Sequence, residues 1–153
     1  MIAVIQRVLE ASVAVDSVLI DSIEGGMLVL LGIRNEDDEN EAKYLAAKTI
    51  NLRIFGDEND KMNLSLLDNN KEMLIISQFT IHADTRHGNR PSFTESCEPS
   101  KAEELYNYYI NECKSLIGNH KVKQGKFGAM MKIKLINDGP VTIILKSKNE
   151  YEQ

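Results

Sequence analysis

The chain has 153 residues, of which 42% are hydrophobic and 27% charged, and it carries a formal net charge of −5. This size and balance predict a soluble globular protein of one domain, residues 1–153, that buries a core without disulfide or metal staples. The longest apolar run, residues 27–31, is far too short to span a membrane, and the chain starts without a secretory signal pattern, so we expect no membrane contact.

Cysteine usage and the distribution of charge narrow the class further. Cys97 and Cys113 have neither metal-ligand spacing nor the number of a disulfide framework, which favours the reducing cytoplasm. Residues 1–75 hold 7 basic and 14 acidic side chains, whereas residues 76–153 hold 11 and 9. The acidic total argues against a long nucleic-acid footprint. Between Cys113 and Asn137, however, every charged residue is a lysine, and this lysine stretch predicts either a solvated face or a small basic patch for an RNA end. Its members are Lys114, Lys121, Lys123, Lys126, Lys132 and Lys134.

The first half of the chain predicts strands around one helix. Val and Ile alternate with polar residues over residues 3–8 and 11–20, which indicates two strands, and a glycine turn at 24–26 leads to a buried strand at 27–33. Apolar residues recur at helical spacing over residues 37–53, after acids that suit the first turn of a helix. Residues 55–70 are polar and rich in turn formers, and residues 72–80 predict another strand.

The second half begins with a long loop. Residues 84–99 contain glycine, prolines and arginines without any period, and so long a loop in a compact domain tends to be functional. Pro99 and Ser100 followed by Glu103 predict a capped helix to about residue 116. Alternation returns over residues 121–124, 129–136 and 141–146, which indicates closing strands. The predicted fold class is α/β, with mixed, barrel-like sheet layers covered by two principal helices.

Two short segments place polar residues where an apolar run ends. The first is Ser77-Gln78-Phe79-Thr80, and the second runs from Asn137 through Gly139-Pro140 to Thr142. Proline lacks an amide hydrogen and glycine has no side chain, so Gly139-Pro140 indicates either a hairpin turn or a backbone surface built for close approach. Phe127, Ala129 and Met130 follow the lysine-rich stretch, and they are either ordinary core or an apolar floor on which an adenine could stack.

The sequence gives little support for a histidine base beside Thr80. If the strand runs through residue 82, Gln78, Thr80 and His82 share one face. Neighbours at i and i+2 point in parallel, however, so His82 is poorly placed as a base for Thr80, and we expect a surface or core role for it. No metal-ligand pattern is present, and we expect neither a metal nor another cofactor.

Several motifs together resemble the D-aminoacyl-tRNA deacylase family. Besides the two segments above, they are the opening residues 1–8, the run at 28–33, the segments at 51–55 and 61–63, Gly88-Asn89-Arg90-Pro91-Ser92-Phe93, and residues 125–131. The resemblance covers residues 1–147 in order. It implies a fold of sheet layers covered by helices and a hydrolase that cleaves the ester of D-aminoacyl-tRNA, with mischarged glycyl-tRNA as a possible further substrate.

The resemblance also implies roles for individual residues. Thr80 is either a nucleophile or a pocket-lining residue beside Ser77, Gln78 and Phe79, with the ribose 2′-hydroxyl of the tRNA then assisting water. A cis Gly139-Pro140 unit enters the pocket of a second subunit and rejects L-aminoacyl esters, which implies a homodimer with sites at the interface. On this view Gly139→Ala impairs substrate admission and leaves folding largely intact.

Two rival functions belong to other classes. The lysine stretch also fits a non-catalytic module that binds RNA ends or nucleotides. A small-molecule esterase with a Ser or Thr nucleophile is the second rival, but the chain has no Gly-x-Ser-x-Gly elbow and no visibly placed Asp and His for a triad.

Overall fold

A long first strand organises the sheet. In the computed structural model, which describes residues 1–151, β1 (Ile2–Val15) pairs antiparallel with β3 (Gly26–Gly32) through its first half and with β2 (Val18–Ile23) through its second. The strand predicted over residues 11–20 is therefore wrong, because the chain turns at Asp16 and Ser17, whose φ angles are 49° and 67°. The alternating pattern runs across this tight turn and hides it. Short polar residues tolerate the left-handed region there.

The middle of the sheet is parallel and buried. β3 pairs with β6 (Glu72–Ser77), and β6 pairs with β7 (Val122–Gln124), so the strand order is β2-β1-β3-β6-β7. The prediction of a strand to residue 80 is wrong at its end: the strand stops at Ser77, and Phe79–His82 form a 3₁₀ turn, η1. A strand face shared by Gln78, Thr80 and His82 therefore does not exist.

The last strand, β8 (Met131–Lys146), is continuous and pairs with β1 from Val15 back to Ile2. The sequence predicts two strands here, with a hairpin turn at Gly139-Pro140 as one alternative. Both expectations are wrong, because the chain passes the glycine and proline with a register shift opposite Val8 and stays in the sheet. The Gly139-Pro140 peptide bond is cis.

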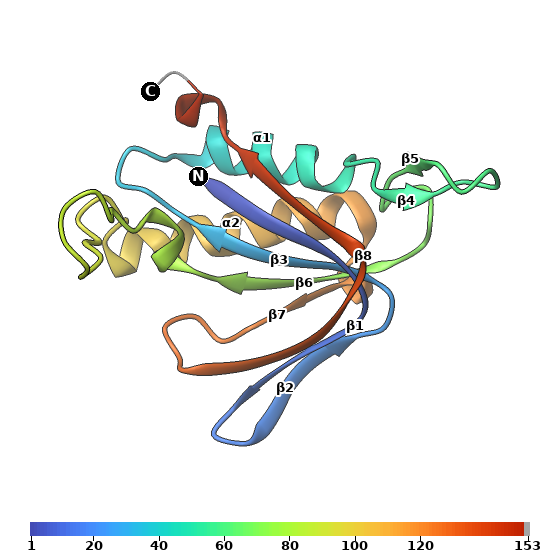
Figure 1. Ribbon diagram of the computed structural model, residues 1–153, viewed down its shortest axis with the longest axis horizontal. Coiled ribbons are helices and arrows are strands. Elements are labelled where there is room, and N and C mark those ends of the chain that lie inside the picture. Colours follow the sequence, from blue (N-terminus) through green and yellow to red (C-terminus); the bar gives the residue numbers. More distant parts are fainter. Residues whose placement is uncertain (152–153) are drawn as a thin grey trace.

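Two helices cover one face of the sheet (Figure 1). The first, α1 (Glu39–Ile50), begins at Asp38, whose side chain accepts hydrogen bonds from the amides of Asn40 and Glu41. The second, α2 (Pro99–Ile117), begins at Glu98, which accepts from the Lys101 amide. The predicted capping by Ser100 and Glu103 is wrong, since the Ser100 hydroxyl instead donates to Glu98. The remaining short elements are β4 (Phe55–Gly56), β5 (Met62–Leu64), η2 (Asn119–Lys121) and η3 (Lys148–Glu150).

The sheet has a hydrophobic core on each face, and it is barrel-like because it curls around the second of these cores. Beneath the helices, Tyr106 and Tyr109 are fully buried, and their hydroxyls donate to Ile75 O and to Thr49 Oγ1, each at 2.8 Å. On the other face a second cluster that includes Val13, Leu28 and Leu74 is enclosed where the sheet curls. The two edge strands of the sheet, β2 and β7, approach each other, and the Gln124 amide of β7 donates a hydrogen bond to Asp21 of β2. The predicted fold class is confirmed.

Candidate functional site

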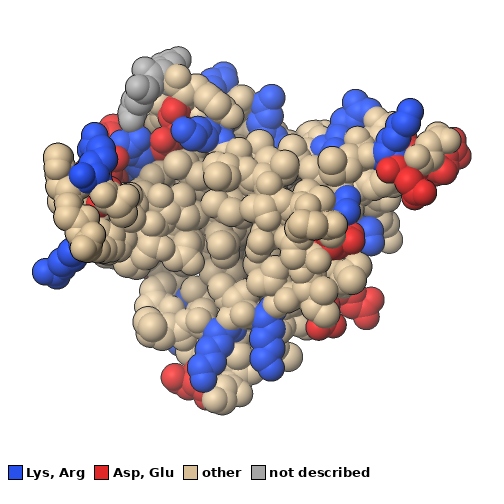
Figure 2. Space-filling view, viewed as in Figure 1, with Lys and Arg blue, Asp and Glu red and all other residues tan. Residues whose placement is uncertain are grey.

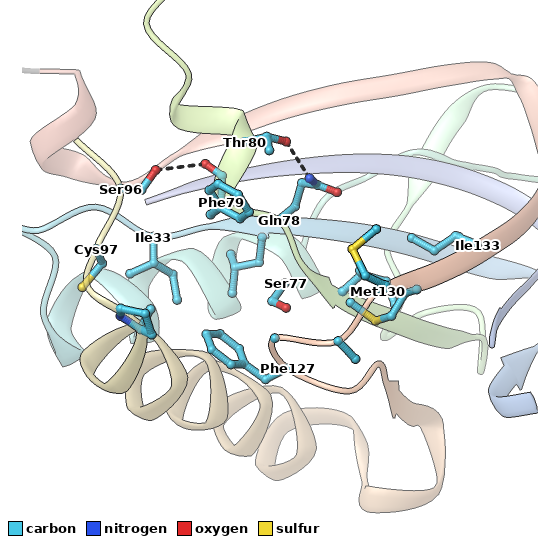
Figure 3. A pocket seen from close by; sticks show the side chains of 17 residues that line it. Ile33, Ser77, Gln78, Phe79, Thr80, Ser96, Cys97, Phe127, Met130 and Ile133 are labelled. Carbon is cyan, nitrogen blue, oxygen red and sulfur yellow. Dashed lines mark hydrogen bonds between the residues drawn. The ribbon is translucent and has the colours of Figure 1, made fainter. Parts of the chain in front are cut away.

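A cavity of about 600 Å³ opens beside the carboxyl ends of β3 and β6 (Figure 3). The two strands end together, since Leu31 pairs with Ser77 and the Gln78 amide donates to Leu31 O at 2.8 Å. Ligand sites in α/β proteins lie at this edge of parallel strands. The turn η1 forms one wall, the start of α2 a second, and the segment leading into β8 a third.

The structure brings together most of the site residues predicted from the sequence. Ser77, Gln78, Phe79, Thr80, Phe127, Ala129 and Met130 all line the cavity. No pattern in the sequence points to Ile33, Cys97, Pro99 and Ala102, which also line the cavity. Ile33 follows β3, and the other three lie at or before the start of α2, which docks against the sheet edge. Ser96 supports the opposite rim, where its hydroxyl donates to Phe79 O at 3.2 Å.

Thr80 faces an amide and not a base. The Gln78 Nε2 group donates to Thr80 Oγ1 at 2.6 Å; Gln78 is half-buried and Thr80 is exposed. An amide N–H cannot take a proton from a hydroxyl, and no histidine or carboxylate of residues 1–151 bonds to Thr80. The geometry therefore leaves the Thr80 hydroxyl without the partner that a nucleophile needs.

His82 turns away from the cavity into the protein. It is 7% exposed, its ring packs against Gly32, and its Nδ1 lies 3.9 Å from Glu150 Oε1. Burial lowers the pKa of His82 below its ordinary value of 6.5, so the ring is neutral at pH 7. Of the two roles expected for this residue, the buried one is confirmed.

The floor and mouth of the cavity are apolar. Phe127 is half-buried and packs against Tyr106 with ring centroids 5.7 Å apart. At the mouth, Phe79 meets Phe93 edge to face at 5.1 Å and is 58% exposed, and Met130 is 91% exposed. Large apolar side chains exposed around a cavity mark a surface that another molecule covers.

Gly139 and Pro140 are exposed on β8 and do not line the cavity of their own chain. Two side chains hold them from either side. Asn137 closes a loop, donating to Val141 O at 3.1 Å and accepting from the Val141 amide at 2.9 Å. Arg7 ion-pairs with Asp138 at 2.9 Å and donates to Ile54 O at 2.6 Å. The two residues therefore form a fixed projection of bare backbone.

The conformation at Gly139 bears on the expected effect of Gly139→Ala on folding. Its φ is 138°, and a Cβ there would lie 2.6 Å from Val141 Cγ2 and 2.7 Å from the Val141 amide nitrogen. An alanine at this position is strained and must shift its surroundings, so we expect Gly139→Ala to cost stability as well as substrate admission.

The cysteines carry no thiolate chemistry at neutral pH. Cys97 lines the cavity and Cys113 lies on the buried face of α2, and both are free thiols. Burial raises the pKa of Cys97 above 9.0 and that of Cys113 to about 12. Within residues 1–151, no three His, Cys, Asp or Glu side chains gather as a metal site, and no helix has the length and apolarity to cross a membrane.

Fold and cavity together define a mixed α/β protein with an enzyme-type site: an apolar pocket at the strand ends, rimmed by a few amide and hydroxyl groups. Comparison with known proteins gives the family. The family model for D-Tyr-tRNA(Tyr) deacylase matches residues 4–146. The D-aminoacyl-tRNA deacylase of Thermosipho africanus is 54% identical over 149 residues, covering 97% of this chain and 99% of that protein. That of Cytophaga hutchinsonii is 52% identical over 150 residues, covering 98% and 99%.

Solved structures agree. A structure described as c-Myc DNA Unwinding Element Binding Protein superposes with a TM-score of 0.92 at 41% identity, covering 96% of this chain and 99% of that one. A probable eukaryotic D-amino acid tRNA deacylase gives 0.81 at 14% identity, over 94% and 97%, which shows the shared fold. The chain belongs to the D-aminoacyl-tRNA deacylase family and is a hydrolase.

Proposed function

We propose that this protein hydrolyses the ester that joins a D-amino acid to the 3′-terminal ribose of tRNA, releasing the amino acid and free tRNA. The observation that carries the proposal is the cavity itself, in which Ser77–Thr80 and the Phe127–Met130 segment face each other across a space that fits an aminoacyl-adenosine. The apolar floor at Phe127 suits the adenine, and the polar strand end suits the ester.

Water, and not Thr80, attacks the ester in this proposal. The Thr80 hydroxyl accepts from Gln78 and has no base, so the neighbouring 2′-hydroxyl of the ribose activates the water. The protein contributes by fixing the ester in place and by polarising its carbonyl with backbone amides, which are effective in a site shielded from water. Thr80 lines the pocket. No cofactor enters the reaction.

Handedness is selected by the Gly139-Pro140 projection of a second copy of the chain. The two residues are exposed, held rigidly by Asn137 and Arg7, and absent from the lining of their own cavity. Entering the partner's cavity, they meet the side chain of an L-aminoacyl ester and leave room for a D side chain. Glycine has no side chain to reject, so glycyl-tRNA is a further substrate.

The surface around β8 supports this homodimer. Ile136 and Ile144 on β8 are 49% and 61% exposed, and Leu9 on the adjacent β1 is 58% exposed. The face that β8 crosses has a broad uncharged centre, with basic side chains on its lower part and other charged side chains towards its margins (Figure 2). Such a face suits burial against an identical copy. We place the enzyme in the cytoplasm, where tRNA is charged and used.

Incubation with D-tyrosyl-tRNA and L-tyrosyl-tRNA tests the proposal. We expect release of D-tyrosine, with the L ester surviving as in a control without enzyme. If both esters persist, the protein is a binding module of the kind the lysine stretch suggests. If both are cleaved at similar rates, it is an unselective esterase, and the proposed role of Gly139-Pro140 fails.

A further inference from the structure

A second cavity, of about 390 Å³, lies between β2, β7 and α2. Phe127 lines both this cavity and the first one, so the two spaces are neighbours separated by one aromatic ring. In Figure 3 Phe127 lies at the side of the first cavity that faces α2. Glu103 and Asn107, which line the second cavity, come from that helix.

The second cavity offers hydrogen-bonding groups that no residue of the described chain uses. Glu103 and Asn107 stand one helical turn apart on α2, and Lys126 follows β7. All three side chains are exposed, and none bonds to another residue of residues 1–151. Asp21 is fixed by accepting from the amides of Ser22 and Gln124, at 3.1 and 3.4 Å. The cavity thus combines carboxylate acceptors with an amide and an ammonium group.

Charge is divided within this cavity. The carboxylates of Asp21 and Glu103 disfavour a phosphate between them and accept well from an amino group. Lysines border the β7 side: Lys126 lines the cavity, and Lys114 donates to the Gln124 side chain at 3.3 Å. An occupant with an exocyclic amino group and a phosphate at one end fits this division.

We propose that the second cavity binds the cytidine that precedes the terminal adenosine of tRNA, which rests on the proposed function above. Every tRNA ends in CCA, so the phosphate of the adenosine held in the first cavity leads directly to a cytidine. Cytosine presents an N4 amino group for which carboxylates are the matching acceptors. Its N3 and O2 atoms accept from Asn107 and Lys126. Uracil has a carbonyl in place of the amino group, which the carboxylates repel.

Short esters test this assignment with the wild-type enzyme. The substrates are D-tyrosyl-adenosine and the same ester on the dinucleotides CpA and UpA. Since a well-placed base contact contributes about a factor of ten, we expect kcat/KM for the CpA ester to exceed that of the adenosine ester about tenfold. The UpA ester should fall within about threefold of the adenosine ester. Calorimetric titration with unacylated CpA, UpA and adenosine supplies a readout that does not need hydrolysis.

Variants locate the effect in this cavity. Glu103→Ala and Asn107→Ala should lose most of the CpA advantage and keep the wild-type rate on the adenosine ester. Glu104→Ala is the matched control, because Glu104 is the next exposed residue of α2 and lies outside the cavity. It should keep both rates. Circular dichroism confirms that all three variants fold.

The outcomes separate this inference from the proposed function. Equal kcat/KM for all three esters overturns the cytidine site and leaves the deacylase proposal standing, as does a CpA advantage that survives Glu103→Ala and Asn107→Ala. No hydrolysis of any D-tyrosyl ester overturns the proposed function. In that case tighter binding of CpA than UpA, lost in Glu103→Ala, still supports the site, and equal binding rejects it.

Discussion

Replacing Thr80 with alanine separates a covalent from a substrate-assisted reaction. The threonine hydroxyl makes one exposed hydrogen bond, with Gln78 Nε2 at 2.6 Å. Losing a neutral hydrogen bond costs about 0.5–1.5 kcal/mol. If the hydroxyl only helps to shape the pocket, the rate therefore falls by no more than about tenfold, since 1.4 kcal/mol is one factor of ten. Removing a true nucleophile costs far more, on the order of 10⁴- to 10⁶-fold.

Single-turnover release of D-tyrosine from D-tyrosyl-tRNA measures this difference directly. Excess enzyme isolates the chemical step, so that product release does not hide a slow reaction. Gln78→Ala is the matched control, because it removes the partner of the same hydrogen bond and keeps the hydroxyl. We expect both variants to lose a similar, small factor. A loss above a thousandfold in Thr80→Ala, restored by Thr80→Ser and absent from Gln78→Ala, would refute the reasoning and identify Thr80 as the nucleophile.

Three further predictions concern stability and selectivity. Gly139→Ala should lower the unfolding free energy by about 1–3 kcal/mol, because φ is 138° and the new Cβ meets Val141 at 2.6 Å; thermal melting and the ratio of D to L ester cleavage check it. Tyr109→Phe removes the buried hydrogen bond to Thr49 and should cost about 1 kcal/mol in urea unfolding; an unchanged midpoint contradicts it. Because burial lowers the pKa of His82 below 6.5, the unfolded chain binds a proton that the folded protein resists, so stability should fall as pH drops from 7 to 5. His82→Asn should reduce this dependence of stability on pH. The Glu41 amide holds the pKa of Asp38 below 3.8, so protonation of Asp38 lowers stability only in stronger acid.

The sequence predicted the elements whose pattern is local. The buried strand at β3 and the helix α1 follow from hydrophobic runs and helical spacing, and their positions agree with the structure within a few residues. The end of β6 could not be predicted in the same way. Phe79 and Ile81 continue the alternation of the strand, although they lie in a 3₁₀ turn that is fixed by tertiary contacts such as Ser96 to Phe79.

For β8, local sequence predicts a break where the structure has a continuous strand. Glycine and proline normally interrupt a strand, and the sequence accordingly divides this region in two. The strand continues because the Asn137 side chain bonds to both the amide and the carbonyl of Val141, replacing the pairing that the bulge removes. Only the folded chain shows that Arg7, far away in the sequence, secures the same loop through Asp138.

The sequence predicted one polar and one apolar segment of the cavity lining, and it did not predict the other lining residues. Ser77–Thr80 and Phe127–Met130 carry recognisable motifs, and both segments line the cavity, on different walls. Cys97, Pro99 and Ala102 have ordinary side chains, and their position depends on how α2 docks against the sheet. The second cavity also lacks a motif, because Asp21, Glu103 and Lys126 come from three elements that meet only where the sheet curls.

The continuity of β8 has a consequence for how the chain can change in length. Met131 and Ile133 face the cavity, while Lys132 and Lys134, which alternate with them, are exposed. Because side chains alternate along a strand, one inserted or deleted residue in the stretch before Asn137 would exchange these two sets and turn lysines into the pocket. The same slip would move the bare backbone at Gly139 along the neighbouring β1. The length of this stretch is therefore fixed by the fold: an insertion or a deletion would change which side chains face the cavity.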